Sequence, residues 1–273
     1  MAHFLKKAEK LLVMKTLILF LSLILIGKSF GQQTRIGFFV PIDLPVKSSM
    51  PKMSTVGGIG FTSSYSPFFH APVSLELKAN IGGYGSRTIS QTYQFDDGSQ
   101  TITDVTYSSG MNKLLIGSKI MVGGDYRAIR GYITPQIGTA RFRSRIAIAD
   151  PADSDACHPL DTDIRQKDRG WVYGGEIGAE IVLSRLLPNR VSDEGHTLFF
   201  SASYLRGFDH FEYVNVKYMT DEIHTTMVTH TTADLNAEFI NLNTNNIHEH
   251  KVAEVYHTPF EMIGLQFGYV YRF

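Results

Sequence analysis

Apolar and polar side chains alternate along this chain with a period of two, which predicts β-strands with two unlike faces. The cleanest stretch is 73–81, where Val, Leu, Ala and Ile alternate with Ser, Glu, Lys and Asn. The same pattern predicts eight strands, at 34–42, 55–65, 73–81, 113–122, 132–143, 171–183, 198–204 and 262–273. An all-β fold with one apolar face on each strand follows.

Two local signals refine these strands. Pro135 cannot donate a ladder hydrogen bond, so we expect a strand end or a bulge within 132–143. The Asp-Gly pair at 97–98 lies between two alternating runs, 88–95 and 100–107, which is a strong hairpin signal. The wall should therefore extend past the third strand. The runs 211–219 and 251–256 are expected to extend the last connection in the same way.

The connections between these strands alternate in length. Three short connections, 67–72, 123–131 and 184–196, alternate with four longer ones, 43–54, 84–111, 144–170 and 207–258. Long connections without structure of their own are uncommon in a compact soluble domain. Short periplasmic turns and long outer loops are typical of an outer-membrane barrel, and an even strand number would place both termini in the periplasm.

The polar faces of the predicted strands carry both signs of charge. If the apolar faces meet lipid, these charges line the lumen, which side chains just fill in an eight-stranded barrel. Opposite charges should pair there, because an unpaired desolvated charge is costly. The predicted lumen network is Glu76, Lys78, Lys113, Lys119, Glu176, Glu180, Gln266 and Arg272. The alternative is that each charge lies on the solvated face of a soluble sheet.

Glycines are frequent on the same polar faces, and we expect them to leave room for the long charged side chains. They are Gly58, Gly60, Gly174, Gly178, Gly264 and Gly268.

The last strand has an aromatic face and ends on an aromatic residue. Its Gln266, Gly268, Tyr271 and Phe273 resemble the C-terminal assembly signal of outer-membrane β-barrels. Together with the strand layout, this makes residues 33–273 similar to the small OmpA/OmpX-type barrels. The resemblance implies a monomeric, eight-stranded antiparallel transmembrane β-barrel in a Gram-negative-type outer membrane, inserted by the barrel-assembly machinery. Because the sequence ends on the last predicted strand, we expect no C-terminal periplasmic domain, and so no peptidoglycan binding through one; this departs from full-length OmpA.

The N-terminal region has the features of an export signal. Lys15 precedes an apolar run over 17–26 that is too short to span a bilayer as an anchor. Small residues follow, so we expect cleavage after Gly31. The domain division is then an extension and signal peptide at 1–31, starting at Met1 or Met14, and a barrel domain at 32–273.

Composition narrows the function classes. The chain has 26 basic and 26 acidic residues, and five lysines but one glutamate lie within 1–31, so the mature chain is mildly acidic. An acidic balance argues against a nucleic-acid partner. The single Cys157, in what reads as an exposed loop, excludes an internal disulfide.

Candidate chemistry is sparse. The aspartates between 150 and 168 lack the Gly and Glu of an EF-hand loop and are interpreted as a solvated acidic loop. His248 and His250 would share a strand face and are weak candidates for a transition-metal site, although no third ligand can be assigned. No catalytic triad or cofactor motif is predicted, so the expectation is no cofactor and, on balance, no enzyme activity.

The favoured hypothesis is an outer-membrane barrel with a filled lumen that presents long loops for binding, adhesion or envelope integrity. Its expected partners are outer-membrane lipid, the assembly machinery and an unidentified extracellular ligand. The alternatives are a barrel enzyme acting on lipid A or peptides, a narrow channel, and a secreted soluble β-barrel or sandwich that binds a ligand.

Overall fold

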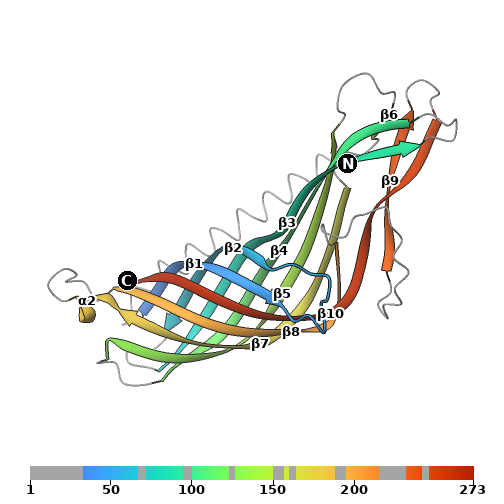
Figure 1. Ribbon diagram of the computed structural model, residues 1–273. Coiled ribbons are helices and arrows are strands. Elements are labelled where there is room, and N and C mark those ends of the chain that lie inside the picture. The colour runs from blue at the N-terminus through green and yellow to red at the C-terminus, as the bar shows by residue number, and fades with distance from the viewer. Residues whose placement is uncertain are drawn as a thin grey trace, which may run out of the picture.

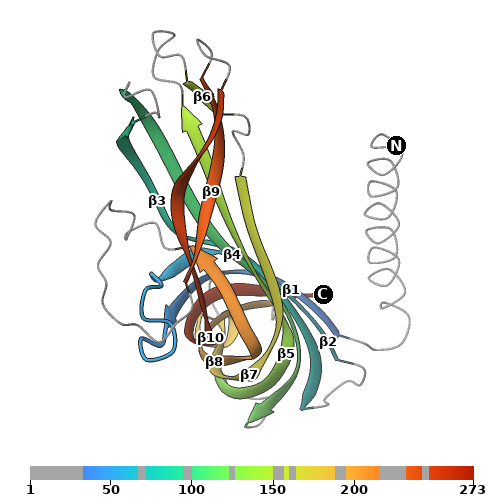
Figure 2. The ribbon, with the colours of Figure 1, turned by 90° about the vertical axis from the view of Figure 1, so that its right-hand side faces the viewer.

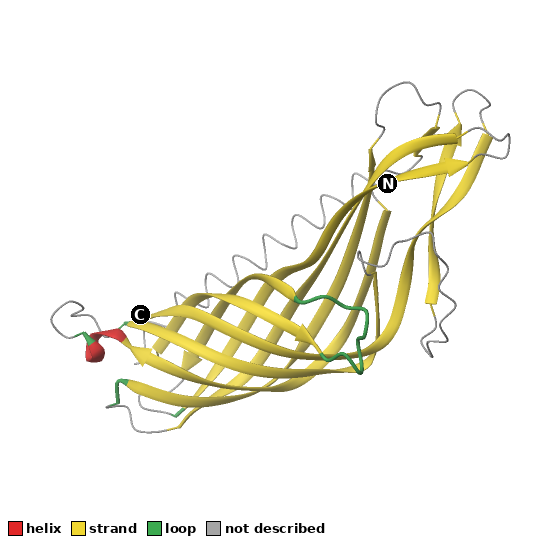
Figure 3. Cartoon of the chain, in the orientation of Figure 1, coloured by secondary structure: helices red, strands yellow, loops and turns green. Residues whose placement is uncertain are grey.

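The computed structural model describes residues 33–66, 72–94, 100–122, 127–149, 157–159, 164–187, 195–214, 232–241 and 246–273. The predicted signal peptide and the predicted Asp-Gly turn lie outside these residues. Strands predominate in the described part (Figure 3), where the one helix is the single turn α2 (Leu183–Leu186). No helix in the described ranges has the length and hydrophobicity needed to cross a bilayer.

Eight long strands form a closed antiparallel barrel (Figure 1). They are β1 (Gln33–Pro45), β2 (Val56–Ser66), β3 (Val73–Gln94), β4 (Gln100–Val122), β5 (Ile129–Ala149), β7 (Ile164–Val182), β8 (His196–Val214) and β10 (Asn246–Arg272). Each pairs with the next of these along the chain, and β1 pairs with β10 from Arg35↔Arg272 to Pro45↔Met262. This last pairing closes the sheet, so the predicted barrel is confirmed.

Exposure alternates along the barrel strands, as the sequence period predicts. On β1, Phe38 and Val40 are exposed, whereas Phe39 and Asp43 are buried. Outward apolar side chains encircle the barrel, with representatives on every strand: Phe38, Ile59, Leu75, Ile116, Ile133, Ile177, Phe200 and Phe267. Soluble proteins do not expose a continuous apolar band of this kind, whereas a transmembrane barrel requires one.

The two ends of the barrel differ. The C-terminus and α2 lie at one end, and β6 (Cys157–Pro159) and β9 (Thr232–Asn241) lie at the other (Figure 1). The described residues of the connections 84–111, 144–170 and 207–258 are all strand, whereas residues 46–55 between β1 and β2 are not. Pairing of β3 with β4 continues to Gln94↔Gln100, which confirms the predicted outward extension of this hairpin.

The extension is two ribbons rather than a closed wall (Figure 2). Toward the end that carries β6 and β9, the pairing of β7 with β8 stops at Val172↔Gly207. At the same end of the barrel, β1 stops at its last residue, Pro45, and β2 starts at its first, Val56. Beyond that level β3, β4, β5 and β7 continue as one ribbon, while β8, β10 and β9 form the other. The extension therefore rises from the barrel with two open seams.

Two local predictions are wrong. Pro135 neither ends nor bulges its strand, because β5 keeps one register with β4 on both sides of it, at Ile133↔Ile120 and Gln136↔Gly117. The missing amide N–H interrupts pairing with β4 locally, while Pro135 stays paired with Gly175 of β7. Cys157 is not in a loop but in β6, opposite Asn241 of β9.

Candidate functional site

The barrel interior holds a buried network of ion pairs. The Lys78 ammonium lies 2.5 Å from Glu176 Oε1 and 3.5 Å from Glu76 Oε2. It also donates to Gln266 Oε1 at 3.2 Å, and the Tyr132 hydroxyl donates to Glu176 at 2.9 Å. These side chains come from β3, β5, β7 and β10, so the network ties separate parts of the wall together.

A second cluster lies around Glu180 of β7. Its carboxylate accepts from Lys119 at 2.6 Å, from Arg35 at 3.0 Å and from Arg130 at 3.1 Å. Lys119 also lies 3.6 Å from Glu76, which joins this cluster to the one around Lys78. Three cations around one buried carboxylate leave a positive excess at this level of the lumen.

Nearer the end that carries β6 and β9, which we call the outer end, Lys113 of β4 pairs with Asp43 of β1 at 2.5 Å. Both side chains are almost fully buried. The Lys113 amide donates to Asn80 Oδ1 at 3.1 Å. Removing one partner of such a pair would leave an uncompensated buried charge. The pair therefore fixes β4 against the far side of the cylinder, where β1 closes on β10.

The structure buries seven of the eight side chains predicted to line the lumen: Glu76, Lys78, Lys113, Lys119, Glu176, Glu180 and Gln266. The eighth, Arg272, is half-buried at the mouth. Sequence reasoning missed four members of the network: Arg35, Asp43, Tyr132 and Arg130. Arg35 lies on the polar face of the predicted strand 34–42, and carrying the alternation one step beyond that strand would have found Asp43.

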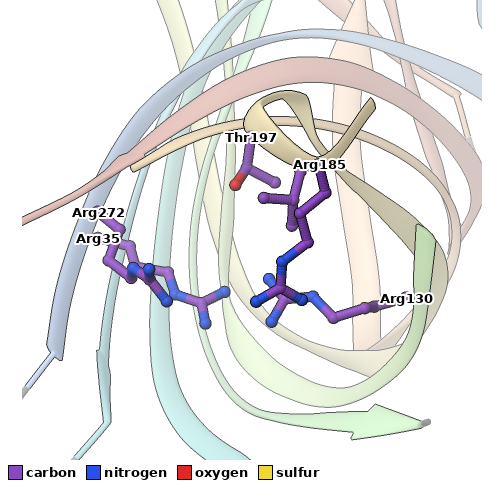
Figure 4. A pocket seen from close by; sticks show the side chains of 6 residues that line it. Arg35, Arg130, Arg185, Thr197 and Arg272 are labelled. Carbon is purple, nitrogen blue, oxygen red and sulfur yellow. The ribbon is translucent and has the colours of Figure 1, made fainter. Parts of the chain in front are cut away.

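Arginines line a pocket at the mouth near the C-terminus (Figure 4). Arg35, Arg130, Arg185 and Arg272 surround it with Val182 and Thr197, and its empty volume, open to solvent, is about 240 Å³. Glu180 balances two of the four arginines from below. The cluster of guanidinium groups suits a small anion. It lies at the end of the lumen next to the Glu180 cluster.

Apolar side chains close the lumen at its outer end. Met50 and Met53, from the connection between β1 and β2, are buried against Phe142, Phe211 and Phe260. The Phe142 ring centroid lies 5.7 Å from that of Phe211 and 6.0 Å from that of Phe260. The rest of this cluster is Val56, Tyr84, Met111, Leu115, Ala140, Val172, Leu205, Tyr213, Tyr256 and Met262. The connection thus folds inward as a plug.

Contacts with β10 hold the plug in place. The Val46 amide donates to the Glu261 carbonyl at 3.0 Å, and Lys47 donates to the Met53 carbonyl at 2.6 Å. The Ser49 hydroxyl donates to the Glu261 carboxylate, which also accepts from Tyr204. These two hydrogen bonds hold the pKa of Glu261 below its ordinary value.

Gly60, Gly178 and Gly268 on the inner face make room for aromatic rings, whereas Gly58 and Gly174 lie against neighbouring backbone. None of these five makes room for the long charged chains that we expected. A Cβ at Gly60 would overlap the Phe39 ring, and one at Gly268 would lie 2.5 Å from Phe199. The rings of Phe39 and Phe199 meet edge to face at 6.2 Å. Gly264 departs from this pattern, since its added Cβ would meet Asp43 at 2.8 Å.

The residues of the predicted assembly signal lie on the closing strand. Gln266 is buried in the lumen, and Gly268 lies beneath Phe199. The rings of Tyr271 and Phe273 meet edge to face at 4.9 Å, and the Phe273 amide donates to the Thr34 carbonyl at 3.0 Å. The end of the chain is thus paired with its first strand.

His248 and His250 lie on β10, opposite Phe239 and Ala237 of β9. Their side chains are outside the described part of the structure. In the described part, no three His, Cys, Asp or Glu side chains gather as a metal site would require.

A closed antiparallel cylinder, an apolar outer face on every strand and a charged, filled interior define a small eight-stranded transmembrane barrel of the outer-membrane type. No protein-family model and no curated protein matches the chain.

Solved structures with a similar arrangement include three bacterial outer-membrane barrels. A major outer membrane protein from Thermus thermophilus is 10% identical, with a TM-score of 0.45, covering 88% of this chain and 99% of that one. The attachment invasion locus protein Ail of Yersinia pestis is 8% identical (TM-score 0.39; 89% and 97% covered). The outer membrane protease OmpT of Escherichia coli is 10% identical (TM-score 0.38; 89% and 96%). At these values the class assignment rests on this barrel's own geometry.

Proposed function

We propose that the protein is a non-conducting outer-membrane barrel that supports a binding surface outside the cell. The observation that carries this proposal is the double closure of the lumen. The charged layer around Glu180 and Lys78 fills the inner half, and the plug containing Met50 and Met53 fills the outer half. A filled barrel is a rigid support, whereas a pore needs an open path.

The extension supplies the surface. Beyond the apolar belt, β3 and β4 continue as a paired hairpin to Gln94↔Gln100, and β10 pairs with β9 as far as Asn246↔Asn241. Strands hold their exposed side chains in fixed positions, so the extension suits binding or adhesion better than a mobile loop would. Export through a cleaved signal peptide and insertion by the assembly machinery, reading residues 266–273, belong to the same proposal.

Conductance in planar bilayers tests the closed lumen. The purified barrel should insert without discrete current steps, and Met50→Ala/Met53→Ala should stay silent as well, because the charged layer remains. Regular unitary steps from the wild-type barrel would overturn the proposal and favour the channel alternative.

Labelling of intact cells tests the orientation. In a Cys157→Ser background, Thr88→Cys lies on the exposed outer part of β3, and the matched control Arg127→Cys is exposed at the opposite end. A membrane-impermeant maleimide should label Thr88→Cys in intact cells and Arg127→Cys only after lysis. The reverse pattern would contradict outward display.

A further inference from the structure

A ladder of basic side chains runs up the outer face of β5 and β7, above the apolar belt. Its members, Arg141, Arg143, Lys167 and Arg169, are all exposed. On β5 they alternate with the buried inward residues Ala140, Phe142 and Ser144. The fold therefore directs these charges to the outside of the wall, where they form a surface that we call the basic ladder.

The cationic positions face one another across the two strands. Arg141 is the register partner of Arg169, and Arg143 is the partner of Lys167. Like charges directly opposite in a sheet are destabilising, with Cβ atoms about 5 Å apart. The next pair along the strands repeats the pattern in sequence, because the backbone of Arg145 is opposite Arg165.

On one side of the basic ladder, β4 places no carboxylate opposite Arg141 or Arg143. On the other side, the Glu212 carboxylate of β8 accepts from the side chain of Gln166 at 2.8 Å. The outward positions of β4 opposite Arg141 and Arg143 are Asn112 and Gly110. Asp168 adjoins the ladder in sequence, but its carboxylate accepts from the backbone amides of Arg169 and Glu212 at 2.8 Å and 2.7 Å. An external anion is therefore the natural counter-charge of this wall.

The height of the ladder identifies the kind of anion. Two residues below Arg141↔Arg169 is the pair Thr139↔Trp171, and two residues further down is Ile137↔Tyr173. Trp171 is 59% exposed, and the centroid of the Tyr173 ring lies 4.6 Å from that of Phe208, with the two rings tilted by 46°. Trp and Tyr mark the interface of transmembrane barrels. Because two residues of strand span about 7 Å, the first basic rung lies at the level of lipid headgroups.

We propose that the basic ladder binds the phosphorylated saccharide headgroup of an outer-leaflet glycolipid. Arginine and lysine would bind its phosphates on successive rungs, since guanidinium groups contact phosphate through paired hydrogen bonds. The acyl chains would lie against Trp171 and Ile137 directly below. This continuity with the belt favours a lipid over a soluble anion, which would have no use for the apolar surface.

The fluorescence of Trp171 provides the test, because it is the one tryptophan of the chain and lies at the foot of the ladder. The mature barrel is placed in nanodiscs of brominated phosphatidylcholine, which quenches Trp171. Diphosphorylated lipid A is then titrated in, in parallel with its dephosphorylated form. Displacement of the brominated lipid restores fluorescence. We expect half-recovery at about ten-fold less of the diphosphorylated lipid.

Matched variants show whether the ladder causes this preference. Arg143→Gln should reduce it, Arg143→Gln/Lys167→Gln should abolish it, and Arg143→Lys should retain most of it. Arg127→Gln, which removes an exposed arginine at the opposite end, should leave it unchanged. Heat-modifiable migration in gels shows that each variant is folded.

Two results would overturn the inference. One is equal recovery by both lipids in the wild-type barrel, or a preference that survives Arg143→Gln/Lys167→Gln. The other concerns a free sulfated disaccharide, added at the same concentration as the diphosphorylated lipid. If the disaccharide suppresses the lipid preference completely, it saturates the ladder, and the site belongs to a soluble anion. Neither result would bear on the proposal that the lumen is closed, because that proposal is tested separately by conductance.

Discussion

Lys78 of β3 and Glu176 of β7 meet across the lumen, with the ammonium 2.5 Å from one carboxylate oxygen and 2.6 Å from the other. The two residues are 98 positions apart in the chain, and both side chains are almost fully buried. A contact of this kind can form only when the sheet has curled far enough to bring β3 opposite β7. It therefore links the stability of the filled lumen to the curling of the sheet.

Removing one partner of this pair should destabilise the barrel strongly. For Lys78→Ala we expect a loss of about 3–5 kcal/mol in the free energy of unfolding, because Glu176 is left as an uncompensated buried charge. The measurement is urea unfolding of the barrel from lipid vesicles.

The double variant Lys78→Ala/Glu176→Ala separates pairing from packing. It should recover part of the loss, since no charge is left unpaired. Arg127→Ala, at an exposed position, serves as the control and should change stability by less than about 0.5 kcal/mol. Strictly additive losses from the two single variants would show that the pair contributes nothing as a pair.

A glycine pair on β2 tests the packing of the inner aromatic rings. Gly60→Ala should destabilise by about 1–3 kcal/mol, because the added methyl group overlaps the buried Phe39 ring. Gly57→Ala on the same strand is the matched control, since its added Cβ has nothing within 4 Å. Similar unfolding midpoints for the two variants would contradict the ring-over-glycine packing.

The plug should loosen in acid. Hydrogen bonds from Ser49 and Tyr204 lower the native pKa of Glu261. The ionised carboxylate therefore stabilises the closed plug at pH values above the ordinary pKa of glutamate. That contribution is lost as pH falls through the lowered native value. The hydrogen-exchange protection factors of the amides in 46–53, which are corrected for the intrinsic pH dependence of exchange, should fall over this pH range.

Glu261→Gln provides the control for this titration. This substitution keeps the shape of the side chain but removes the ionisable group. The protection factors of the amides in 46–53 should therefore be lower at neutral pH, and they should no longer fall in acid. If the variant and the wild type exchange alike at every pH, Glu261 does not hold the plug.

The alternation of side chains predicted the barrel and its inward charges because both follow from local period. It did not predict that Lys78 meets Glu176 or that Glu180 gathers three cations, because those contacts depend on the stagger between strands. Asp43 was missed because the predicted strand ended at Ile42, three residues before the end of β1 at Pro45. Met50 and Met53 were missed for a different reason: their segment has no period, and only the closed barrel shows that it folds inward.

The terminal residue should matter for assembly more than for the finished barrel. Phe273 is 62% exposed, and its described contacts are one backbone hydrogen bond to Thr34 and an edge-to-face contact with Tyr271. Deleting it removes little buried surface, so unfolding of the refolded barrel should shift by no more than about 1 kcal/mol. Outer-membrane levels in cells should nevertheless fall, because the resemblance of the closing strand to the assembly signal depends on this aromatic end. Quantitative blotting of membrane fractions measures this effect, with Phe208→Ala as an exposed aromatic control away from the terminus. Unchanged levels of the truncated protein would refute the assembly role.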